Sequence, residues 1–498
     1  MTHLSPDRET FARLASDHVV VPIWREILAD VQTPVAAFLR LREVWPDAFL
    51  LESVEGGERW ARHSFVGGDA YATVKAKDGR VWVEGDPTVR PEAGETPLEY
   101  VRRLLDAYSA PRLEELPPFH GGAVGFIGYD CVRELETLPE GPPDDLGLPD
   151  LALILSRTLV VFDHLSQKAF VIVNVPVGND LPRLYDEAHR RCDEIVAVLE
   201  RPLPPAPLGI SPARETRFDC MVDDADYERW VEDAREHIFA GDIFQVVPSR
   251  RFSARLPGSS FDAYRMLRTT NPSPYMYFLR FAATREHPEF EIAGSSPEPL
   301  VRVSGKHIVT RPIAGTSGRG RTQEEDVALA EELLGDEKER AEHVMLVDLA
   351  RNDVGRVARY GSVTVDELMV IERYSHVMHI VSNVSGELAD GRSSFDALLA
   401  CFPAGTVSGA PKVRAMEIID SLERTRRGPY AGVVGYFDFA GDLDTCITIR
   451  TIVATGGRAY VQAGAGVVAD SVPAAEADET RRKAEALLRA VAAATAQP

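Results

Sequence analysis

The order of apolar and polar residues predicts a chain in which strands and helices alternate without long breaks. Short apolar runs rich in β-branched residues predict strands, and apolar residues spaced three or four positions apart predict helices. In the first 200 residues these patterns predict strands at 48–53, 156–163 and 169–175 and helices at 96–108 and 181–199. A Pro-rich stretch at 201–212 (RPLPPAPLGISP) then predicts a surface linker.

The segment after the linker begins with a predicted helix at 224–240, which ends at Gly241 as helices commonly do. Near the C-terminus, a turn at Gly441-Asp442 and a hairpin signal at Gly456-Gly457 separate three predicted strands at 431–439, 445–455 and 459–468. Strands that follow one another through short turns pair antiparallel. The pattern therefore argues against a βαβ layout.

Two predicted helices carry pairs of glutamates on their apolar faces. At about 100° per residue, Glu339 and Glu342 of the helix at 336–359 share a side with its apolar residues. That side holds Leu346, Leu349, Ala350, Asp353, Val354 and Val357, and the opposite side holds Lys338, Arg340, Arg351 and Arg356. In the last helix, which begins near Pro473, one stripe holds Glu476, Glu479, Lys483 and Leu487.

A carboxylate on a buried face is costly unless a cation or hydrogen-bond donors compensate it. The two pairs therefore indicate either a protein-bound divalent metal or a shared catalytic site. The alternative is that the glutamates are solvated and pair with Arg340 or Arg482.

Composition limits the classes of molecule that the protein can bind and the cellular compartment in which we expect it. The 498 residues suffice for one large domain or two to three ordinary ones, and 45% hydrophobic with 27% charged residues is typical of a soluble globular protein. A net charge of −22 argues against nucleic acid and anionic membranes as main partners, so an anionic substrate needs a local basic site or a metal. The five scattered cysteines, the charged N-terminus and the lack of a membrane-length apolar run predict a reduced, cytoplasmic protein.

Two Gly-rich segments are candidate anion sites. Residues 311–321 (RPIAGTSGRGR) combine exposed backbone amides with three arginines, and the alternative is a flexible basic loop. Residues 401–412 (CFPAGTVSGAPK) lead into a helix that starts near Pro411, and the alternative is an ordinary capped helix start. The second segment lacks the spacing of a Walker A loop.

Single residues add further candidates. Arg450 is expected within the strand at 445–455, where a buried arginine needs a partner. Gly464 and Gly466 on the next strand predict either a bulge or a close approach of the backbone to a ligand. His379 could donate a proton near neutral pH, and His376 is the competing candidate; either could instead be an ordinary core histidine.

Taken together, these segments resemble the chorismate-utilising enzymes, and most closely anthranilate synthase component I. The resemblance runs in order from about residue 225 to 490. Its motifs are GDIFQVVPSR (241–250), RPIAGT (311–316), ERAEHVMLVDLARND (339–353), VMH (377–379), PAGTVSGAPK (403–412), QAGAG (462–466) and EADET (476–480).

Two positions discriminate within this family. Aminodeoxychorismate synthases typically carry a lysine where this chain has Ala314, and isochorismate and salicylate synthases carry a water-activating lysine where it has Gln245. Both positions favour ammonia as the nucleophile and anthranilate as the product. One departure is Ser317-Gly318, where many relatives have Arg-Pro. The alternatives are an aminodeoxychorismate or aminodeoxyisochorismate synthase that releases no pyruvate, and a catalytically silent chorismate- or tryptophan-binding regulator.

The resemblance implies a Mg²⁺-dependent site for chorismate. The implied metal ligands are Glu342, Glu479 and Glu476, and the implied catalytic residues are Glu339 as general base, His379 as acid and Thr406. The implied substrate-binding residues are Gly315, Thr316, Tyr430, Arg450, Gly464, Gly466 and Lys483. It also implies an α+β fold, a large sandwich of packed antiparallel sheets flanked by helices.

The N-terminal part resembles the same family more weakly. Residues 50–53 (LLES), 62–65 (RHSF) and 271–276 (NPSPYM) resemble elements of a tryptophan feedback pocket, whose implied residues are Glu52, Ser53, Pro274, Tyr275 and Met276. We therefore expect a regulatory region at 1–200, the linker at 201–216 and a catalytic region at 217–495. The resemblance also implies that a glutamine amidotransferase supplies the ammonia. No cysteine of this chain lies in a Gly-x-Cys-x-Gly turn, so that amidotransferase would be a separate subunit in a hetero-oligomer.

Overall fold

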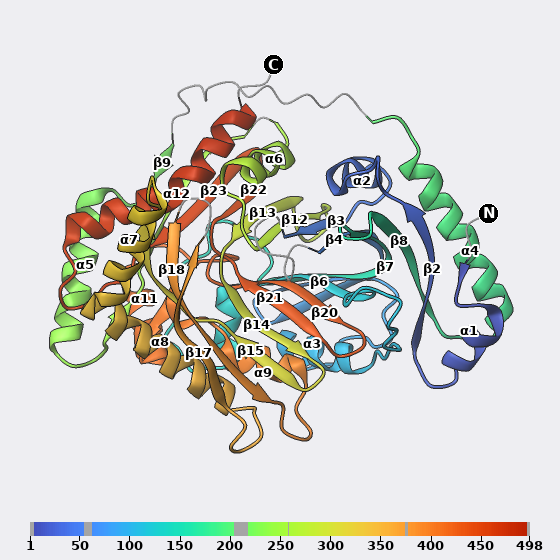
Figure 1. The fold of residues 1–498 in the computed structure, drawn as a ribbon, viewed down its shortest axis with the longest axis horizontal. Helices are drawn as coiled ribbons and strands as arrows, with labels where there is room; N and C mark the ends of the chain where they lie inside the picture. The colour runs from blue at the N-terminus through green and yellow to red at the C-terminus, as the bar shows by residue number, and fades with distance from the viewer. Residues whose placement is uncertain (1–3, 54–61, 204–217, 257, 374–376, 496–498) are drawn as a thin grey trace.

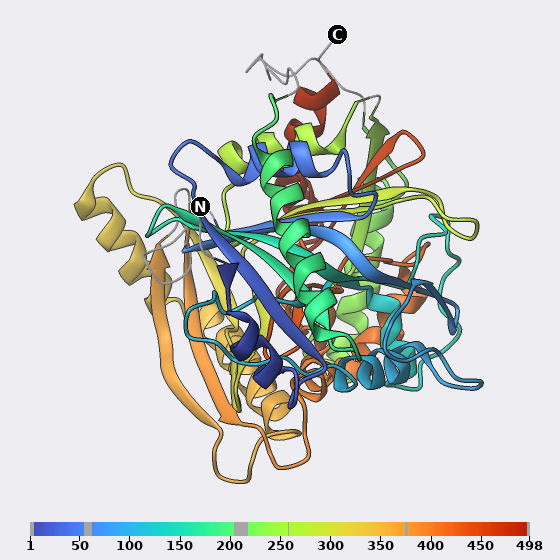
Figure 2. The same cartoon turned by 90° about the vertical axis from the view of Figure 1, so that its right-hand side faces the viewer.

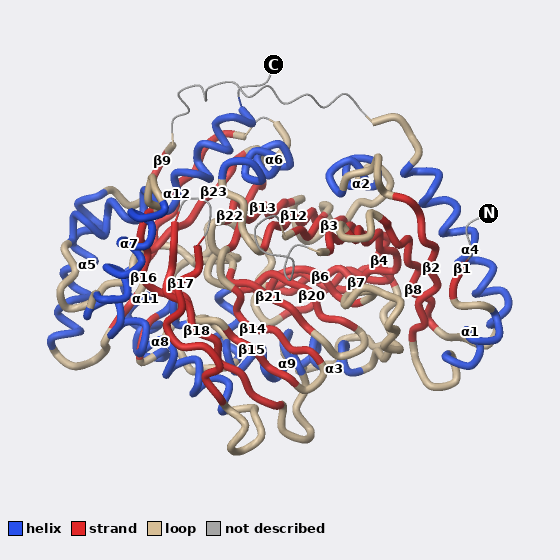
Figure 3. Tube along the Cα trace, in the orientation of Figure 1, coloured by secondary structure: helices blue, strands red, loops and turns tan. Residues whose placement is uncertain are grey.

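The structure is a computed structural model that describes residues 4–53, 62–203, 218–256, 258–373 and 377–495. Most of the predicted linker and the candidate His376 lie outside these residues. Figure 1 shows the strands crossing the middle of the molecule with most helices on its periphery, and Figure 3 shows the same separation by colour. The expected α+β architecture of antiparallel sheets flanked by helices is confirmed.

Every strand ladder is antiparallel, and hydrogen bonds connect 21 of the strands described here into one branched sheet. Its N-terminal strands are β1 (Leu4–Ser5), β2 (Val20–Leu28), β3 (Ala48–Glu52), β4 (His63–Lys77), β5 (Arg80–Gly85), β6 (Gly122–Ile127), β7 (Leu151–Asp163), β8 (Lys168–Pro176) and β9 (Asp219–Cys220). The strands that follow are β11 (Ser249–Arg255), β12 (Tyr275–Phe281), β13 (Phe290–Ser296), β14 (Pro299–Ser304), β15 (His307–Thr310), β16 (Ile313–Gly318), β17 (Thr364–Arg373), β18 (Val377–Glu387), β20 (Val433–Asp438), β21 (Leu443–Ile447), β22 (Thr451–Thr455) and β23 (Arg458–Gly464). A separate small pair joins β10 (Gln245–Val246) to β19 (Gly409–Ala410).

Helices cover the outer faces of this sheet. They are α1 (Arg8–Leu14), α2 (Pro34–Leu41), α3 (Pro97–Asp106), η1 (Tyr129–Glu134), α4 (Leu181–Leu199), α5 (Asp224–Phe239), α6 (Ser260–Thr270), α7 (Gln323–Gly335), α8 (Glu337–Gly355), α9 (Ser394–Cys401), α10 (Gly405–Ser408), α11 (Lys412–Leu422) and α12 (Pro473–Thr495). In Figure 2, α4 lies across the N-terminal strands, and it packs on β2 and β8. No helix among the described residues is long and apolar enough to cross a membrane.

Strands from both sides of the linker pair directly with one another. Strand β3 pairs with β12, which sets Glu52 opposite Met276, and β6 pairs with β20, which sets Ile127 opposite Val433. One apolar cluster likewise joins residues from both parts, among them Phe49, Phe126, Tyr277 and Val434. The two expected regions therefore share a sheet and a core.

One local expectation is corrected by the structure. The single strand expected at 445–455 is two strands, β21 and β22, and Arg450 lies in the break between them. Arg450 has a φ of 51°, a left-handed backbone conformation that cannot continue a strand ladder. The Gly-rich segment at 311–321, for which a flexible basic loop was the alternative to an anion site, contains strand β16, which pairs with β18.

Candidate active site

Helix α8 places two of the predicted glutamates at its N-terminal end. Asp336 caps the helix, because its carboxylate accepts hydrogen bonds from the backbone amides of Lys338 (2.8 Å) and Glu339 (3.0 Å). Further along, the buried Leu346 and Val354 hold the predicted apolar face against the core. Glu339 and Glu342 are half-buried on this face, as predicted.

Helix α12 supplies the second group of charged residues. The Lys483 ammonium lies 2.7 Å from Glu479 Oε1 and donates to the Gly464 carbonyl at 3.1 Å. Ser471, just before the helix, hydrogen-bonds the Glu476 carboxylate. The stripe of Glu476, Glu479 and Lys483 predicted from the sequence is therefore held toward the end of β23.

The carboxylates of α8 and α12 lie close enough to affect one another. Burial raises the pKa of Glu339, and Glu342 and, across the helix pair, Glu479 raise it further. Burial also raises the pKa of Glu476, and Glu479 contributes in the same direction. The site thus concentrates negative charge that a cation would offset.

Within the described part of the chain, the site offers too few grouped side chains for a metal whose ligands all come from the protein. Its carboxylate oxygens suit Mg²⁺, which also binds water and substrate. Among the residues that the structure describes, no three His, Cys, Asp or Glu side chains are arranged to hold one metal ion. Glu342 accepts a hydrogen bond from Gln245 Nε2 at 2.9 Å, and Glu479 pairs with Lys483. Mg²⁺ commonly takes one or two protein carboxylates and completes its octahedron with waters and substrate oxygens. The donor set therefore fits Mg²⁺, and the ligand assignment stays a prediction.

Strands β16 and β18 bring Gly315, Thr316 and His379 beside α8. Gly315 has a φ of 65°, and a Cβ built on it would lie 3.2 Å from Glu339 Oε2. His379 Nδ1 lies 3.1 Å from both the Gly315 carbonyl and Thr316 Oγ1. If Nδ1–H donates to the carbonyl, Nε2 is the nitrogen left for proton exchange in the predicted acid role.

Arg450 and Tyr430 form the cationic and hydroxyl side of the site. Among the described residues, the Arg450 guanidinium has no hydrogen-bond or ion-pair partner. Burial lowers the pKa of Arg450, and the nearby Tyr430 and Glu479 counteract that effect. An unpaired, half-buried guanidinium beside a tyrosine is suited to a carboxylate ligand.

Gly464 and Gly466 let other residues of the protein pack directly against their backbone. A Cβ on Gly464, the last residue of β23, would lie 2.7 Å from the Pro248 carbonyl and 3.0 Å from the Tyr430 hydroxyl. A Cβ on Gly466, beyond the end of the strand, would lie 2.8 Å from Gln245 Nε2. Side chains at either position would displace candidate site residues.

One residue that the sequence patterns missed is Glu298. It lies between β13 and β14, is 9% exposed, and accepts a hydrogen bond from Thr406 Oγ1 at 2.9 Å. Burial raises the pKa of Glu298 to about 7, although Thr406 and Lys483 act to lower it. A carboxyl group that titrates near neutral pH beside a substrate site is a candidate proton donor. It occupies no helix stripe, so periodicity could not have identified it.

Two of the three arginines and the lysine of the Gly-rich segments have partners within the protein. Arg311 pairs with Glu372 and Arg319 with Asp326, so these guanidinium groups are bound within the protein. Lys412, at the start of α11, pairs with Asp353 at 3.0 Å. From the first predicted anion site, Gly315 and Thr316 lie at the candidate active site. From the second, Thr406 does.

Of the predicted regulatory residues, Glu52 and Met276 face each other in the β3–β12 ladder. Glu52 accepts hydrogen bonds from Tyr264 (2.6 Å) and Arg268 (3.0 Å), and the buried Ser53 hydroxyl has no partner among the described residues. Tyr275, which follows Pro274 in the chain, donates to Asp444 at 2.9 Å.

A hydrogen bond connects this region to the active site. The Ser295 amide donates to the Arg450 carbonyl at 3.1 Å, and the Ser295 hydroxyl also contacts Asn271 and Ser273.

A family model described as chorismate binding enzyme matches residues 47–489. The chain belongs to this family of chorismate-binding enzymes. It is 47% identical over 483 residues to anthranilate synthase component 1 of Acetivibrio thermocellus, covering 96% of each chain. It is 49% identical over 493 residues to anthranilate synthase component 1 of Mycolicibacterium smegmatis, covering 98% of this chain and 94% of that relative.

Solved structures agree with this assignment. Anthranilate synthase component I from Streptococcus pneumoniae is 38% identical and superposes with a TM-score of 0.76, over 93% of this chain and 98% of that one. The menaquinone-specific isochorismate synthase of Escherichia coli is 20% identical, with a TM-score of 0.68 over 97% and 98% of the two chains, and shares the fold.

Proposed function

We propose that this chorismate-binding enzyme is the chorismate-converting component of an anthranilate synthase. It converts chorismate and ammonia to anthranilate, pyruvate and water, the first committed step of tryptophan biosynthesis. The observation that carries the proposal is the meeting of the α8 and α12 carboxylates beside the Arg450 guanidinium, which is unpaired within the described part of the chain. The full-length similarity to enzymes named anthranilate synthase component 1 supports the same reaction.

Chorismate carries two carboxylates, and the site offers groups for both charges. Arg450 and Lys483 supply positive charge, and Tyr430 and the amides of Gly464 and Gly466 supply hydrogen-bond donors. In a chain of net charge −22, this local group of donors is what admits an anionic substrate.

Mg²⁺ fits beside the glutamates that face one another across α8 and α12. Glu342 and Glu479 would hold it directly and Glu476 through water or as a second ligand, and when bound it would neutralise carboxylate charge and polarise the substrate. Burial first, and neighbouring carboxylates second, raise the pKa values of Glu339 and Glu476, and this unfavourable charge supports a bound cation.

The reaction needs a proton for the departing hydroxyl and a base for the ring proton. Ammonia adds to the ring as the hydroxyl leaves as water, and His379 and Glu298 are the proposed donors of that proton. Loss of the enolpyruvyl side chain as pyruvate then aromatises the ring. Glu339, whose pKa is raised, is the candidate that accepts the ring proton. Gln245 offers no basic group to activate water, which favours ammonia as the nucleophile.

Ammonia must be made elsewhere, because no thiol here is suited to glutamine hydrolysis. Burial raises the pKa of all five cysteines, Cys131, Cys192, Cys220, Cys401 and Cys446, which disfavours the reactive thiolate. The name component 1 of the relatives also supports a second component. We therefore infer a glutamine amidotransferase subunit as the partner, in a cytoplasmic hetero-oligomer.

Tryptophan is the proposed feedback inhibitor. The proposed binding residues are Glu52, Ser53, Pro274, Tyr275 and Met276, and Glu52 pairs with Met276 across β3 and β12. The Ser53 hydroxyl, which has no partner among the residues that the structure describes, supports a polar ligand there.

The test uses the purified chain with chorismate, Mg²⁺ and ammonium at mildly alkaline pH. Anthranilate fluorescence and pyruvate are followed together, with and without tryptophan. Equal amounts of both products, suppressed by tryptophan, are the expected result. Loss of chorismate without pyruvate would contradict the proposal and indicate a product that retains the enolpyruvyl group.

A further inference from the structure

A buried ion pair, Arg427 with Glu423, lies behind the candidate active site. Arg427 is 2% exposed and Glu423 6%. Arg427 Nε lies 3.1 and 3.0 Å from the two carboxylate oxygens, and Nη2 lies 2.6 Å from Oε1. A buried ion pair is weak evidence for added stability, because desolvation offsets the Coulomb attraction. The remaining contacts of this pair are therefore more informative than the pair itself.

The Arg427 guanidinium also binds two backbone carbonyls from different parts of the site. Nη1 donates to Val407 and Nη2 to Val247, each at 2.7 Å. Val407 follows Thr406, and Val247 lies two residues after Gln245. A planar guanidinium can bind a carboxylate and two carbonyls at once, which an ammonium on a lysine stem cannot reproduce.

Glu423 fixes the strand that faces Gly464. Its Oε1 accepts from both the amide and the hydroxyl of Ser249 at 2.8 Å. Ser249 pairs with Gly464 in the β11–β23 ladder, and its hydroxyl accepts from Gln462 Nε2 at 2.8 Å. The ion pair therefore sets the position of the strand end proposed to bind a substrate carboxylate.

Two tyrosine rings flank the Arg427 guanidinium. Its Cζ lies 4.7 Å from the ring centroid of Tyr129 and 5.6 Å from that of Tyr430. Tyr129 comes from the N-terminal part, and its amide donates to the Gly428 carbonyl at 2.9 Å. The contact thus joins the N-terminal part of the chain to the turn that carries Tyr430.

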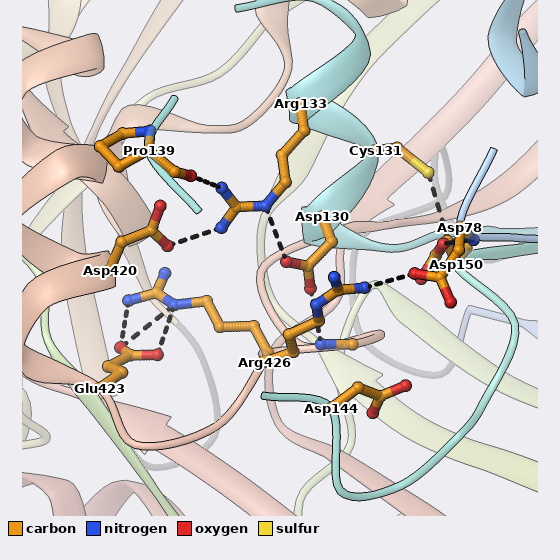
Figure 4. A network of polar contacts seen from close by, with 12 residues as sticks. Asp78, Asp130, Cys131, Arg133, Pro139, Asp144, Asp150, Asp420, Glu423 and Arg426 are labelled. Carbon is orange, nitrogen blue, oxygen red and sulfur yellow. Dashed lines mark hydrogen bonds and ion pairs between the residues drawn. The ribbon is translucent and has the colours of Figure 1, made fainter. Parts of the chain in front are cut away.

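Neighbouring ion pairs hold this contact between the two parts. In Figure 4, Arg133 lies between Asp130 and Asp420, and Arg426 lies close by with its guanidinium toward Asp78. Asp130 also accepts from the Gly428 amide at 3.3 Å.

We infer that Arg427 is a positioning residue of the chorismate site. It holds the Thr406 turn, the Gln245 segment and Tyr430 in one arrangement, with Tyr129 of the N-terminal part as its support. The inference rests on the proposed function, because these three segments matter only if they bind and convert chorismate. It predicts that a variant can remain folded and yet lose the geometry of the site.

The first variant is Arg427→Lys, which keeps the positive charge but loses the planar guanidinium and its several N–H donors. We expect it to fold, with kcat/KM for chorismate lowered by about 100-fold, the scale that a displacement of about 1 Å produces. For Arg427→Ala, added guanidinium should restore part of the activity at concentrations that leave the thermal midpoint unchanged. Sodium chloride at equal ionic strength should not. Arg25→Ala is the matched control, because Arg25 forms a partly buried pair with Asp193 far from the site, and it should keep full activity.

Tyr129 provides a second, milder test. Its hydroxyl has no partner among the described residues, so Tyr129→Phe keeps the ring and should behave like the unmodified chain. Tyr129→Ala removes the ring beneath Arg427 and should lower kcat/KM for chorismate. A kcat/KM within about threefold of the unmodified chain for Arg427→Lys, or a loss of activity that only follows the loss of folded protein, would overturn the inference.

Chorismate affinity is measured separately by calorimetry. If the unmodified chain makes no anthranilate, the proposed function fails. Arg427→Lys should still bind chorismate more weakly than the unmodified chain in that case. Unchanged chorismate affinity and unchanged turnover in Arg427→Lys would overturn the positioning role alone.

Discussion

Replacing Glu298 by glutamine separates acid catalysis from structure at one buried carboxyl. The Glu298 side chain accepts a hydrogen bond from Thr406 Oγ1, and a glutamine oxygen can accept the same bond. The substitution therefore removes the titrating proton while keeping size and the Thr406 contact. If Glu298 protonates the departing hydroxyl, we expect kcat to fall by about 10²–10⁴, the usual contribution of general acid catalysis.

The same substitution should increase stability above neutral pH. A pKa raised from 4.5 to about 7 means that the folded protein binds this proton more tightly than the unfolded chain. Stability from this group is therefore present at low pH and is lost as pH rises from 4.5 toward 7. The pKa difference corresponds to about 3 kcal/mol of unfolding free energy, which Glu298→Gln should recover at alkaline pH and not at acidic pH.

The assay measures kcat against pH at a constant concentration of free ammonia, together with urea unfolding at acidic and alkaline pH. The unmodified chain should lose activity as pH rises past about 7, because Glu298 loses its proton there. The variant should lack this decline. The exposed Glu286→Gln is the control for charge alone and should change neither quantity. A variant with kcat within about threefold of the unmodified chain and the same decline would refute the argument and leave His379 as the acid.

Four further substitutions test the rest of the site. Glu479→Gln should abolish Mg²⁺-dependent turnover with the circular dichroism spectrum unchanged; activity within a factor of about three would show the metal assignment to be wrong. Arg450→Ala should raise KM for chorismate by about 10²-fold, since a charge-assisted hydrogen bond contributes about 1.5–3 kcal/mol, and an unchanged KM would exclude it as a carboxylate ligand. Gly464→Ala should lower kcat/KM, because the new methyl group would lie 3.0 Å from the Tyr430 hydroxyl; steady-state kinetics at saturating ammonium measures this. Ser53→Ala should leave catalysis unchanged and raise the tryptophan concentration for half-inhibition, and equal inhibition would remove Ser53 from the pocket.

Local sequence patterns were sufficient where one helix decides the outcome. Helix periodicity placed Glu339 and Glu342 on the inner face of α8, and Glu476, Glu479 and Lys483 on one stripe of α12. These predictions hold because a residue's position on a helix face depends only on its spacing along the chain. Residue motifs, in turn, indicated the chorismate-binding family before any contact was known.

Local sequence patterns could not predict contacts between segments that are distant along the chain. Arg450 was expected inside a strand, but packing of 447–449 against Glu298 and Gly432 breaks the ladder and gives Arg450 a left-handed backbone. Glu298 gains its raised pKa only because β13, β14 and the Thr406 turn enclose it. Arg427 and Glu423 are four residues apart, and only the fold brings Val247, Val407 and Tyr129 around them.

The sequence by itself therefore determined which side chains each helix turns inward and which family the motifs resemble. Only the tertiary structure decided which segments share the site. Burial, desolvation and the partners of a buried charge depend on residues hundreds of positions away, and no local spacing records them.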